Sequence, residues 1–394
     1  MEKSLRNMFK DKRVLVTGHT GFKGSWLCIW LKELGAEIVG YALEPNTEKD
    51  NFVVTGLADK ITHITGNIKD FDKLRGVFAL HQPEFVFHLA AQPIVRESYA
   101  HPKETYDVNI GGTVNVLECC RLEDSVKVII NVTSDKCYEN REWIWGYREN
   151  DPMGGHDPYS SSKGCSELIT RAYRDSFFAS NEFEAHRKCL SSVRAGNVIG
   201  GGDWQQDRIV PDCIRALSGG NPIEVRNPTA IRPWQHVLEP LSGYLLLASR
   251  MYKNPQDYSG AWNFGPDHNS FMTVGELVEK IVIHWGHGKW KNPPHNKQPH
   301  ETNLLNLDSA KAKAYLKWFP VWDMEKTIEK TVEWYKMYRR EDPFNLCVSQ
   351  IESFQFHKKR GQDGHQHSPC KATRRICRNT GDDTEFLPAF TQRA

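Results

Sequence analysis

A tyrosine and a lysine with the spacing of a proton-transfer pair occur in the segment PYSSSK. Tyr159 and Lys163 are four residues apart, so on a helix they lie on one face. An ammonium beside a phenol stabilises the phenolate and lowers the tyrosine pKa from about 10, which makes Tyr159 a usable base at neutral pH. Ser134, at the end of an earlier strand-like run, supplies a hydroxyl to align a substrate alcohol. The alternative is a chance YxxxK on a surface helix.

A second candidate site lies in the segment VTSDKCY, which places Asp135 and Lys136 after the apolar run VKVII. Burying two titratable side chains at the end of a strand is costly unless they pair with each other or take part in a reaction. The residues alone leave both interpretations open.

The segment VTGHTGFKG has the spacing of a phosphate-binding loop. Gly18, Gly21 and Gly24 follow the strand-like run RVLVT and open an amphipathic stretch, where glycine permits a tight turn and lets backbone amides approach a pyrophosphate. The spacing is a weak signal by itself, but between a strand and a helix it predicts a dinucleotide site. Glu44 comes slightly late to bind ribose hydroxyls, and no Arg stands there for a 2′-phosphate, which favours NAD over NADP.

These segments belong to a regular alternation of short apolar strands and amphipathic helices. Strands are expected at 13–17, 37–42, 84–91 and 126–134, with a strand that leads into a loop at 189–200, and helices at 23–35, 109–122 and 158–178. Near-continuous apolar strands separated by helices predict an α/β fold with a doubly wound Rossmann parallel sheet. Later loops rich in Gly, Pro and Arg, with helices expected at 238–252, 274–285 and 324–340, predict a smaller C-terminal lobe.

The chain is therefore expected to divide into three parts. These are an NAD-binding Rossmann domain at 1–196, a mainly substrate-binding lobe at 197–349 with some segments returning to the sheet, and a flexible tail at 350–394. The tail is predicted because its sequence has no period and few large apolar residues. Its possible metal ligands match no known spacing, so no metal site is predicted; they are His357, His365, His367, Cys370 and Cys377.

The overall charge excludes several classes of partner. The 51 Lys and Arg residues nearly balance the 49 Asp and Glu residues, and a net charge of +2 provides no field for binding nucleic acid or an anionic membrane. The N-terminus lacks the apolar core of a signal peptide, and the longest apolar stretches are far short of a membrane span. Ten scattered cysteines without a CxxC pair fit a reducing compartment. We therefore expect a soluble cytoplasmic protein.

The combination of TGHTGFKG, HLAAQP, NIGGTVN, TSDKCY and YSSSK resembles the extended short-chain dehydrogenase/reductase family. The longer segments TSDKCYENREWIWGYREND, RAGNVIGGGDW, RIVPD and IRPWQHVLEPLSGYLLLA are similar to the nucleotide-sugar 4,6-dehydratases that act on CDP-glucose. The likeness runs from about residue 8 to 350. It implies a Rossmann fold, bound NAD, a homodimer with a four-helix interface, and a role in deoxysugar synthesis for O-antigen lipopolysaccharide.

The resemblance implies a three-step reaction of CDP-D-glucose, in which hydride leaves C4 for NAD⁺, water is lost across C5 and C6, and the hydride returns to C6. It makes Tyr159 the base at O4, Lys163 the group that lowers the Tyr159 pKa and binds the nicotinamide ribose, and Ser134 a hydrogen-bond partner of O4. Asp135 and Lys136 occupy the positions of the acid near the C6 hydroxyl and the base near C5. Related dTDP-glucose dehydratases carry Asp-Glu there.

These roles require shifted pKa values. The Asp135 pKa must rise above about 3.9, and the Lys136 pKa must fall well below about 10.4. Burial produces both shifts, whereas an ion pair between the two side chains would push both the wrong way. We therefore expect Asp135 and Lys136 to point to different atoms of the substrate, with a salt bridge as the alternative.

The resemblance also implies further binding residues. Those for the cofactor are Gly18, Thr20, Gly21, Phe22, Lys23, Gly24, Asn67, Ile68, Leu89, Ala90, Ala91, Asn109, Thr133, Tyr159 and Lys163. Those for the nucleotide sugar are Ser134, Asn197, Arg208 and Arg232, since a guanidinium suits a diphosphate. A surface salt bridge is the alternative for Arg208.

Two other classes of function stay open. A nucleotide-sugar 4-epimerase needs the Ser–Tyr–Lys set but no acid–base pair for elimination, so Asp135 and Lys136 favour a dehydratase. A non-catalytic NAD-binding regulatory protein has no use for Tyr159 and Lys163 on one helical face. A 4-keto sugar product, which absorbs in alkali, distinguishes a dehydratase from both.

Overall fold

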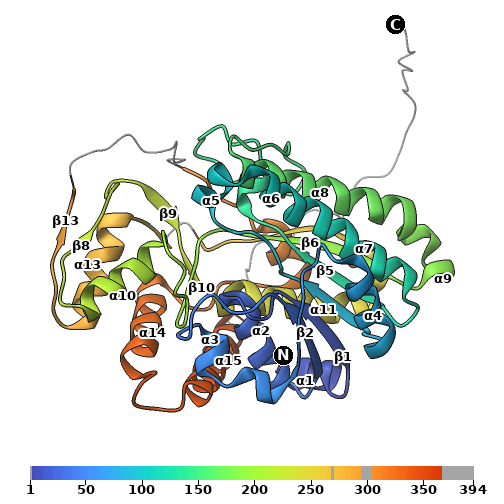
Figure 1. Cartoon of the computed structure of the whole chain (residues 1–394), viewed down its shortest axis with the longest axis horizontal. Coiled ribbons are helices and arrows are strands. Elements are labelled where there is room, and N and C mark those ends of the chain that lie inside the picture. The colour runs from blue at the N-terminus through green and yellow to red at the C-terminus, as the bar shows by residue number, and fades with distance from the viewer. Residues whose placement is uncertain (1, 268–269, 294–303, 366–394) are drawn as a thin grey trace, which may run out of the picture.

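A seven-stranded parallel sheet forms the centre of the computed structural model, which describes residues 2–267, 270–293 and 304–365 (Figure 1). Its strands are β1 (Arg13–Thr17), β2 (Glu37–Ala42), β3 (Thr62–Thr65), β4 (Phe85–His88), β5 (Val128–Val132), β6 (Cys189–Ala195) and β11 (Gly260–Phe264). They are ordered β11-β6-β5-β4-β1-β2-β3. The chain runs outward from β1 to β3 and resumes with β4 on the other side of β1. Ligands of doubly wound sheets bind at the carboxyl ends of the strands beside such a reversal.

Alternate residues of the central strands are buried on opposite faces of the sheet, which is why β1, β4 and β5 are mostly apolar, whereas the edge strand β3 is partly exposed and rich in Thr. In β1, Val14 and Val16 join the apolar cluster on one face, whereas Leu15 joins the cluster on the other. The first face is covered by α1 (Glu2–Phe9), α2 (Phe22–Glu33) and α11 (Leu238–Lys253), and the second by α4 (Phe71–His81), α7 (Gly112–Leu122) and α8 (Pro158–Phe177). The predicted doubly wound Rossmann fold is confirmed.

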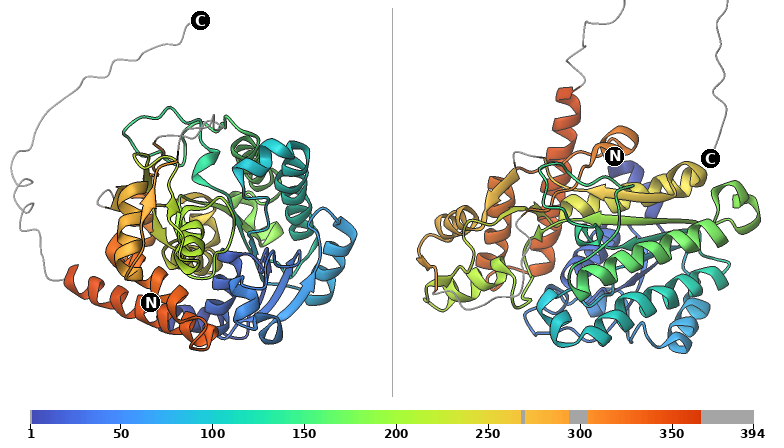
Figure 2. Two further views of the ribbon diagram at one scale, coloured as in Figure 1. Left: turned by 60° about the vertical axis from the view of Figure 1, so that its left-hand side comes forward. Right: turned by 90° about the horizontal axis from the view of Figure 1, so that it is seen from above.

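A smaller lobe lies beyond the carboxyl ends of the strands (Figure 2). It contains α10 (Ile209–Ser218), α13 (Val274–Trp285), α14 (Met324–Met337), and the strand pairs β8 (Ile223–Glu224) with β13 (Trp290–Lys291) and β9 (Ile231–Pro233) with β12 (Phe271–Thr273). Two segments of the second half of the chain belong to the sheet layers, because β11 pairs with β6 and α11 covers one face. The remaining short elements are α3 (Asn51–Val54), α5 (Val95–Ala100), α6 (Pro102–Tyr106), α9 (Phe183–His186), α12 (Pro255–Tyr258), β7 (Val198–Ile199) and β10 (Gln235–His236).

Helix α11 contains one of the longest apolar stretches of the chain, and it is a core element. Tyr244, Leu245 and Leu247 are all fully buried against the sheet layer. In the part of the chain that the structure describes, no helix is long and apolar enough to cross a membrane.

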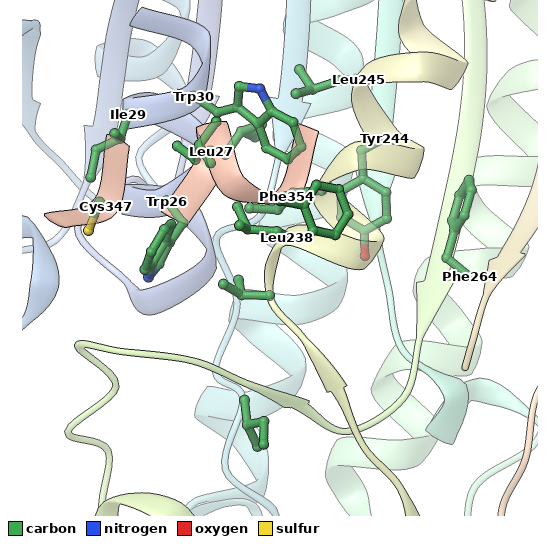
Figure 3. Close-up of a cluster of buried hydrophobic side chains, with 14 of the residues drawn as sticks. Trp26, Leu27, Ile29, Trp30, Leu238, Tyr244, Leu245, Phe264, Cys347 and Phe354 are labelled. Atoms are coloured by element: carbon green, nitrogen blue, oxygen red, sulfur yellow. The ribbon is translucent and has the colours of Figure 1, made fainter. Parts of the chain in front are cut away.

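The last described element, α15 (Pro343–His365), corrects the prediction that the chain loses regular structure at residue 350. Ile351 and Phe354 are buried, and the Phe354 ring lies 5.8 Å from that of Trp30 in α2 (Figure 3). The apolar residues of α15 are separated by polar ones at helical spacing, so the segment appears polar on average. The helix is held by an apolar surface that only the folded chain provides. Residues 366–394 lie outside the described part.

Candidate active site

Helix α8 carries the Tyr159–Lys163 pair on one buried face. The Asp157 side chain caps this helix by accepting a hydrogen bond from Ser160 N–H at 2.9 Å. Tyr159 and Lys163 lie one turn apart, and both are buried. Lys163 Nζ donates to the carbonyl of Val132, the last residue of β5, at 3.4 Å. The predicted common face is confirmed, and it points at the carboxyl end of a central strand.

The electrostatics of Tyr159 differ from the expectation. Burial raises the pKa of Tyr159 to about 12; a side-chain hydrogen bond with Ser134 and the charge of Arg208 lower it, while Asp135 raises it. Lys163, whose own pKa burial lowers to about 8, is not among the principal groups that act on Tyr159. The role of Lys163 in lowering the Tyr159 pKa therefore stays a prediction. The increase in the Tyr159 pKa that burial causes is larger than the decrease that Ser134 and Arg208 cause.

Asp135 and Lys136 begin a single 3₁₀ turn, Asp135–Cys137, just after β5. The Asp135 carboxylate is buried and accepts a hydrogen bond from Ser134 Oγ at 3.0 Å. Burial raises the Asp135 pKa, although the charge of Lys136, the Ser134 hydrogen bond and the charge of Lys23 lower it. Among the described residues no ion pair joins Asp135 to Lys136, which disfavours the salt-bridge alternative. A carboxyl with a raised pKa is suited to donate a proton.

The glycine loop between β1 and α2 has room only for backbone. Gly18 has φ +76°, and a Cβ there would lie 2.6 Å from the nitrogen of Ala90. A Cβ on Gly24 would lie 2.1 Å from the carbonyl oxygen of Gly18. Gly21 occupies the N-cap of α2 without a side-chain hydrogen bond, so no capping side chain covers the first amides of the helix. The loop therefore fits a pyrophosphate bound at a helix N-terminus.

The segment after β4 is held against the end of β1. The N–H groups of Leu89 and Ala90 donate to Thr17 Oγ1 at 3.2 and 3.3 Å. This contact brings the small residues of HLAAQP up to the glycine loop, as predicted for a surface on which a cofactor packs. Of the other residues predicted for the cofactor, Thr20, Ile68 and Thr133 are buried, and Phe22, Lys23 and Ala91 are half-buried.

Asn67 and Asn109 make hydrogen bonds within the protein. Asn67 Oδ1 accepts from the N–H of Lys69 at 3.0 Å. The Asn109 amide accepts from the Gln92 N–H at 2.8 Å and donates to the Gln92 carbonyl at 3.1 Å and to Ser162 Oγ at 2.9 Å. Asn109 therefore ties the segment after β4 to α8. Its contact with a cofactor stays a prediction.

Lys23 lies closer to the proton-transfer residues than the sequence suggested. Burial and the charge of Arg208 lower its pKa to about 8, whereas Asp135 and Asp203 raise it. The sequence assigned Lys23 to the cofactor alone. No spacing in the chain indicates its proximity to Asp135, because Lys23 lies in the first turn of α2, after β1, and Asp135 lies in the turn after β5.

Arg208 precedes α10 and forms an ion pair with the buried Asp203, whose carboxylate lies 2.8 Å from its Nη1. The salt bridge that was the alternative for Arg208 is thus present. It lies at the site, since the Arg208 charge lowers the pKa of both Tyr159 and Lys23. A guanidinium already paired with a carboxylate must share or exchange that partner to bind a diphosphate.

The other two residues predicted for the substrate lie at the entrance of the small lobe. Asn197 is exposed just after β6, and its carbonyl accepts from the Gln235 N–H at 3.0 Å. Arg232 lies in β9 and donates from Nη1 to the Ile231 carbonyl at 2.9 Å. Their contact with a substrate stays a prediction.

Three functional candidates were missed by the sequence analysis, namely Tyr138, Glu167 and Arg194, which form a buried polar network beneath the site. Two signals were available. Glu167 follows Lys163 by four residues on the same helical face, and Arg194 interrupts an otherwise small and apolar strand.

Among the described residues no group of three or more Cys, His, Asp or Glu side chains is arranged to hold a metal ion. His357 Nδ1 lies 2.8 Å from the Ser353 carbonyl of its own helix. The side chains of the other four residues considered as tail ligands lie outside the described part.

Comparison with known proteins places these features in a family. The family model of GDP-mannose 4,6-dehydratase matches residues 15–331. The CDP-glucose 4,6-dehydratase of Salmonella typhimurium is 50% identical over 343 residues, which cover 87% of this chain and 95% of that protein. The UDP-glucose 4-epimerase of Halalkalibacterium halodurans is 25% identical over 337 residues, which cover 82% of this chain and 95% of that protein.

A solved structure shares the fold at lower identity. The dTDP-glucose 4,6-dehydratase of Bacillus anthracis, solved in complex with NAD, has a TM-score of 0.67 and 21% sequence identity. The match covers 85% of this chain and 99% of that chain. It supports the doubly wound sheet with a small lobe at the carboxyl ends of its strands.

Proposed function

The chain belongs to the GDP-mannose 4,6-dehydratase family, and from this premise we propose that it is an NAD-dependent dehydratase that converts CDP-D-glucose to CDP-4-dehydro-6-deoxy-D-glucose. The observation that carries the proposal is the buried carboxyl of Asp135, hydrogen-bonded to Ser134 and close enough to act on the Tyr159 pKa. Elimination of water requires such a proton donor next to the residue that handles O4. Epimerisation at C4 requires none. The identity to the CDP-glucose enzyme supports the choice of nucleotide sugar.

NAD fits the residues at the carboxyl edge of the sheet. The glycine loop with Gly18, Gly21 and Gly24 would hold the pyrophosphate, and Leu89 and Ala90 would pack against the cofactor. When bound, NAD accepts hydride from C4 of the sugar and returns it to C6. Lys163, now hydrogen-bonded to the end of β5, lies on the face of α8 that would reach the nicotinamide ribose.

The protein's own residues handle the protons. Tyr159 takes the proton from O4 as C4 is oxidised, and its side-chain hydrogen bond with Ser134 favours the phenolate. When the substrate binds, the single Ser134 hydrogen that now points to Asp135 would turn to O4. Because burial alone keeps the phenol protonated at neutral pH, the Arg208 charge also contributes to making Tyr159 a base.

Elimination falls to the 3₁₀ turn after β5. The 4-keto group acidifies the C5 hydrogen, Lys136 removes that proton, and Asp135 protonates the departing C6 hydroxyl so that it leaves as water. Once hydride has returned to C6, a solvent-exchangeable proton is delivered back to C5 to complete the product. The raised Asp135 pKa supports its role as donor. The absence of an ion pair between the two among the described residues supports the proposal that they address different atoms.

The direct test is product formation. The purified chain is incubated separately with CDP-, dTDP-, GDP- and UDP-glucose, with and without added NAD⁺, and the alkaline absorbance of a 4-keto-6-deoxy sugar is recorded. We expect a signal with CDP-glucose alone. A signal with another nucleotide sugar would correct the substrate, and an interconverted hexose without keto product would indicate an epimerase.

We also propose that the enzyme acts in the cytoplasm as a dimer paired through α7 and α8. Large apolar side chains are exposed around these helices, namely Tyr99, Tyr106, Leu122, Leu168 and Phe177. Light scattering should give twice the chain mass, and Leu168→Arg, placed on an exposed face of α8, should shift it toward one chain. A wild-type protein that scatters as a single chain at all concentrations would refute this interface.

A further inference from the structure

We propose that a buried ion pair between Glu167 and Arg194 acts as a positioning clamp that fixes both ends of the segment carrying Ser134, Asp135 and Lys136. The clamp consists of Thr133, Tyr138, Glu167 and Arg194. The inference rests on the proposed function, because it assigns the clamp to the elimination step of that reaction.

The ion pair at the centre of the clamp is bidentate and secluded. Arg194 Nε and Nη2 each donate to one oxygen of the Glu167 carboxylate at 2.8 Å. Both side chains are only 4% exposed. Ser192 Oγ donates to Glu167 Oε2 at 2.6 Å, so the carboxylate is held by the strand as well. Parallel N–H···O bonds of this kind fix the relative orientation of the two groups.

The two ends of the catalytic segment attach to this pair. At the start, the Thr133 hydroxyl donates to Glu167 Oε1, and the Thr133 N–H donates to the Val193 carbonyl at 2.9 Å. At the end, Arg194 Nη1 donates to the Tyr138 hydroxyl and its guanidinium carbon lies 4.8 Å from the centre of the Tyr138 ring. The turn that holds Asp135 and Lys136 is thus attached to the ion pair at both ends, through Thr133 and Tyr138.

Tyr138 extends the clamp to the edge of the sheet. Its hydroxyl donates to Asn263 Oδ1 in β11 at 2.8 Å. The side chain is buried, and its ring stacks on Tyr147 at 5.1 Å. Arg194 Nη1 also donates to the Glu149 carbonyl at 3.0 Å, so it keeps one acceptor when the Tyr138 hydroxyl is removed.

The clamp also sets two other parts of the site. Glu167 lies one turn beyond Lys163 on α8, which couples the segment to the helix that carries Tyr159. Arg194 lies two residues before Gly196, and a Cβ on Gly196 would come within 3.1 Å of Asp135 Oδ2. The backbone that packs against the Asp135 carboxyl therefore directly follows β6, the strand that contains Arg194.

Stability is a poor explanation for such a pair. Burying two charges costs about as much as their attraction returns, and well-packed apolar residues of similar volume often do as well or better. Orientation is the property that apolar packing would not supply here. Tyr159 and Lys163 are fixed by their own helix, and only Ser134, beside the Thr133 end of the clamped segment, also serves the oxidation. Both elimination residues, Asp135 and Lys136, depend on the segment. Loosening it should therefore slow elimination more than oxidation, most selectively at the Tyr138 end.

The test uses Tyr138→Phe in the full chain, which removes one hydroxyl and keeps the ring. The matched control is Tyr244→Phe, because the Tyr244 hydroxyl is equally buried and has no hydrogen-bond partner among the described residues. Single-turnover reactions with CDP-glucose are followed at the absorbance of reduced nicotinamide, whose rise reports C4 oxidation and whose decay follows elimination. In D₂O, deuterium at C5 of the product reports the elimination directly.

We expect Tyr138→Phe to slow the decay roughly 10- to 100-fold while the rise changes by less than about threefold, since a displacement of about 1 Å is enough for such a loss. Tyr244→Phe should leave both phases as in the wild type. Thr133→Val should also slow the decay more than the rise, although the rise should fall as well, because Thr133 precedes Ser134 and is one of the residues predicted for the cofactor. Thr133→Ser, which keeps the hydroxyl, should recover most of both losses. If Tyr138→Phe does not fold, the two Thr133 variants test the clamp proposal instead.

The outcomes separate the two proposals. Suppose that the wild-type chain forms a keto product, but Tyr138→Phe and Thr133→Val either slow both phases equally or slow neither phase. The clamp proposal is then refuted, and the dehydratase proposal stands. If the wild-type chain forms no keto product from CDP-glucose, the proposed function fails and the clamp falls with it.

Discussion

Replacing Gly24 by alanine should weaken the binding of NAD and destabilise the fold, whereas the same replacement at Gly76 should do neither. Both glycines lie within helices, in α2 and α4 respectively, so helix propensity favours alanine at each by about 1 kcal/mol. The two sites differ in their surroundings. A Cβ at Gly76 would meet no described residue within 4 Å, whereas a Cβ at Gly24 would lie 2.1 Å from the Gly18 carbonyl oxygen.

The size of the effect follows from that distance. An ordinary contact is 3.4–4 Å, so the Gly18 carbonyl or the first turn of α2 must move by more than 1 Å. Overpacking of this kind costs roughly 1–3 kcal/mol, which exceeds the propensity gain. The same movement displaces the amides that face the pyrophosphate, and losing one hydrogen bond to a charged group costs roughly 1.5–3 kcal/mol. We therefore expect NAD affinity to fall by roughly 10- to 100-fold.

The assay combines titration of the protein with NAD, read by calorimetry, and thermal unfolding without ligand. Gly76→Ala should bind NAD as the wild type does and melt slightly higher, by about 1 °C for a chain of this length. Gly24→Ala should melt lower and bind weakly. A Gly24→Ala protein that binds NAD within twofold of the wild type and melts no lower would refute the reasoning, because the backbone contact would then be no constraint.

Three further predictions follow from the described contacts. Asp135→Asn keeps an acceptor for Ser134 but has no acidic proton, so keto product should form roughly 100- to 10,000-fold more slowly while nicotinamide reduction persists, which alkaline absorbance and single-turnover traces would reveal. His236 is fully buried between two Trp rings, and burial lowers its pKa to about 3 from 6.5, so its stabilising contribution is present above pH 6.5 and is lost as the pH falls toward 3. The unfolding free energy of His236→Phe minus that of the wild type should therefore be about 2 kcal/mol larger at pH 5 than at pH 7.5. Parallel urea titrations at the two pH values that show no such increase would contradict the lowered His236 pKa. Lys358 in α15 donates to the Ser242 hydroxyl, and its charge lowers the pKa of the buried Glu239, which burial raises. Lys358→Met should therefore lower the unfolding free energy by roughly 1–3 kcal/mol, whereas Met at the exposed neighbour Lys359 should change it little.

The sequence by itself determined most of the central elements and the chemistry that is local along the chain, but it did not indicate β3, β11 or α4. Apolar runs fixed the strands, since a strand covered on both faces admits few polar residues. Helical spacing placed Tyr159 and Lys163 on one face, and the glycine loop followed from its position between a strand and a helix. The spacing of Asp135 from the strand end likewise indicated a residue at the carboxyl edge of the sheet.

Only the tertiary structure decided what lies across from these residues. Burial, which depends on the whole fold, raised the Tyr159 pKa against the local expectation, and Arg208 joined Ser134 as a group that lowers it. The Glu167–Arg194 ion pair joins α8 to β6, which follows it in the chain. Helix α15 packs on apolar surfaces contributed by α2 and by segments of the second half of the chain. These contacts join residues distant in sequence, and the period of one segment carries no information about which other segment will pack against it.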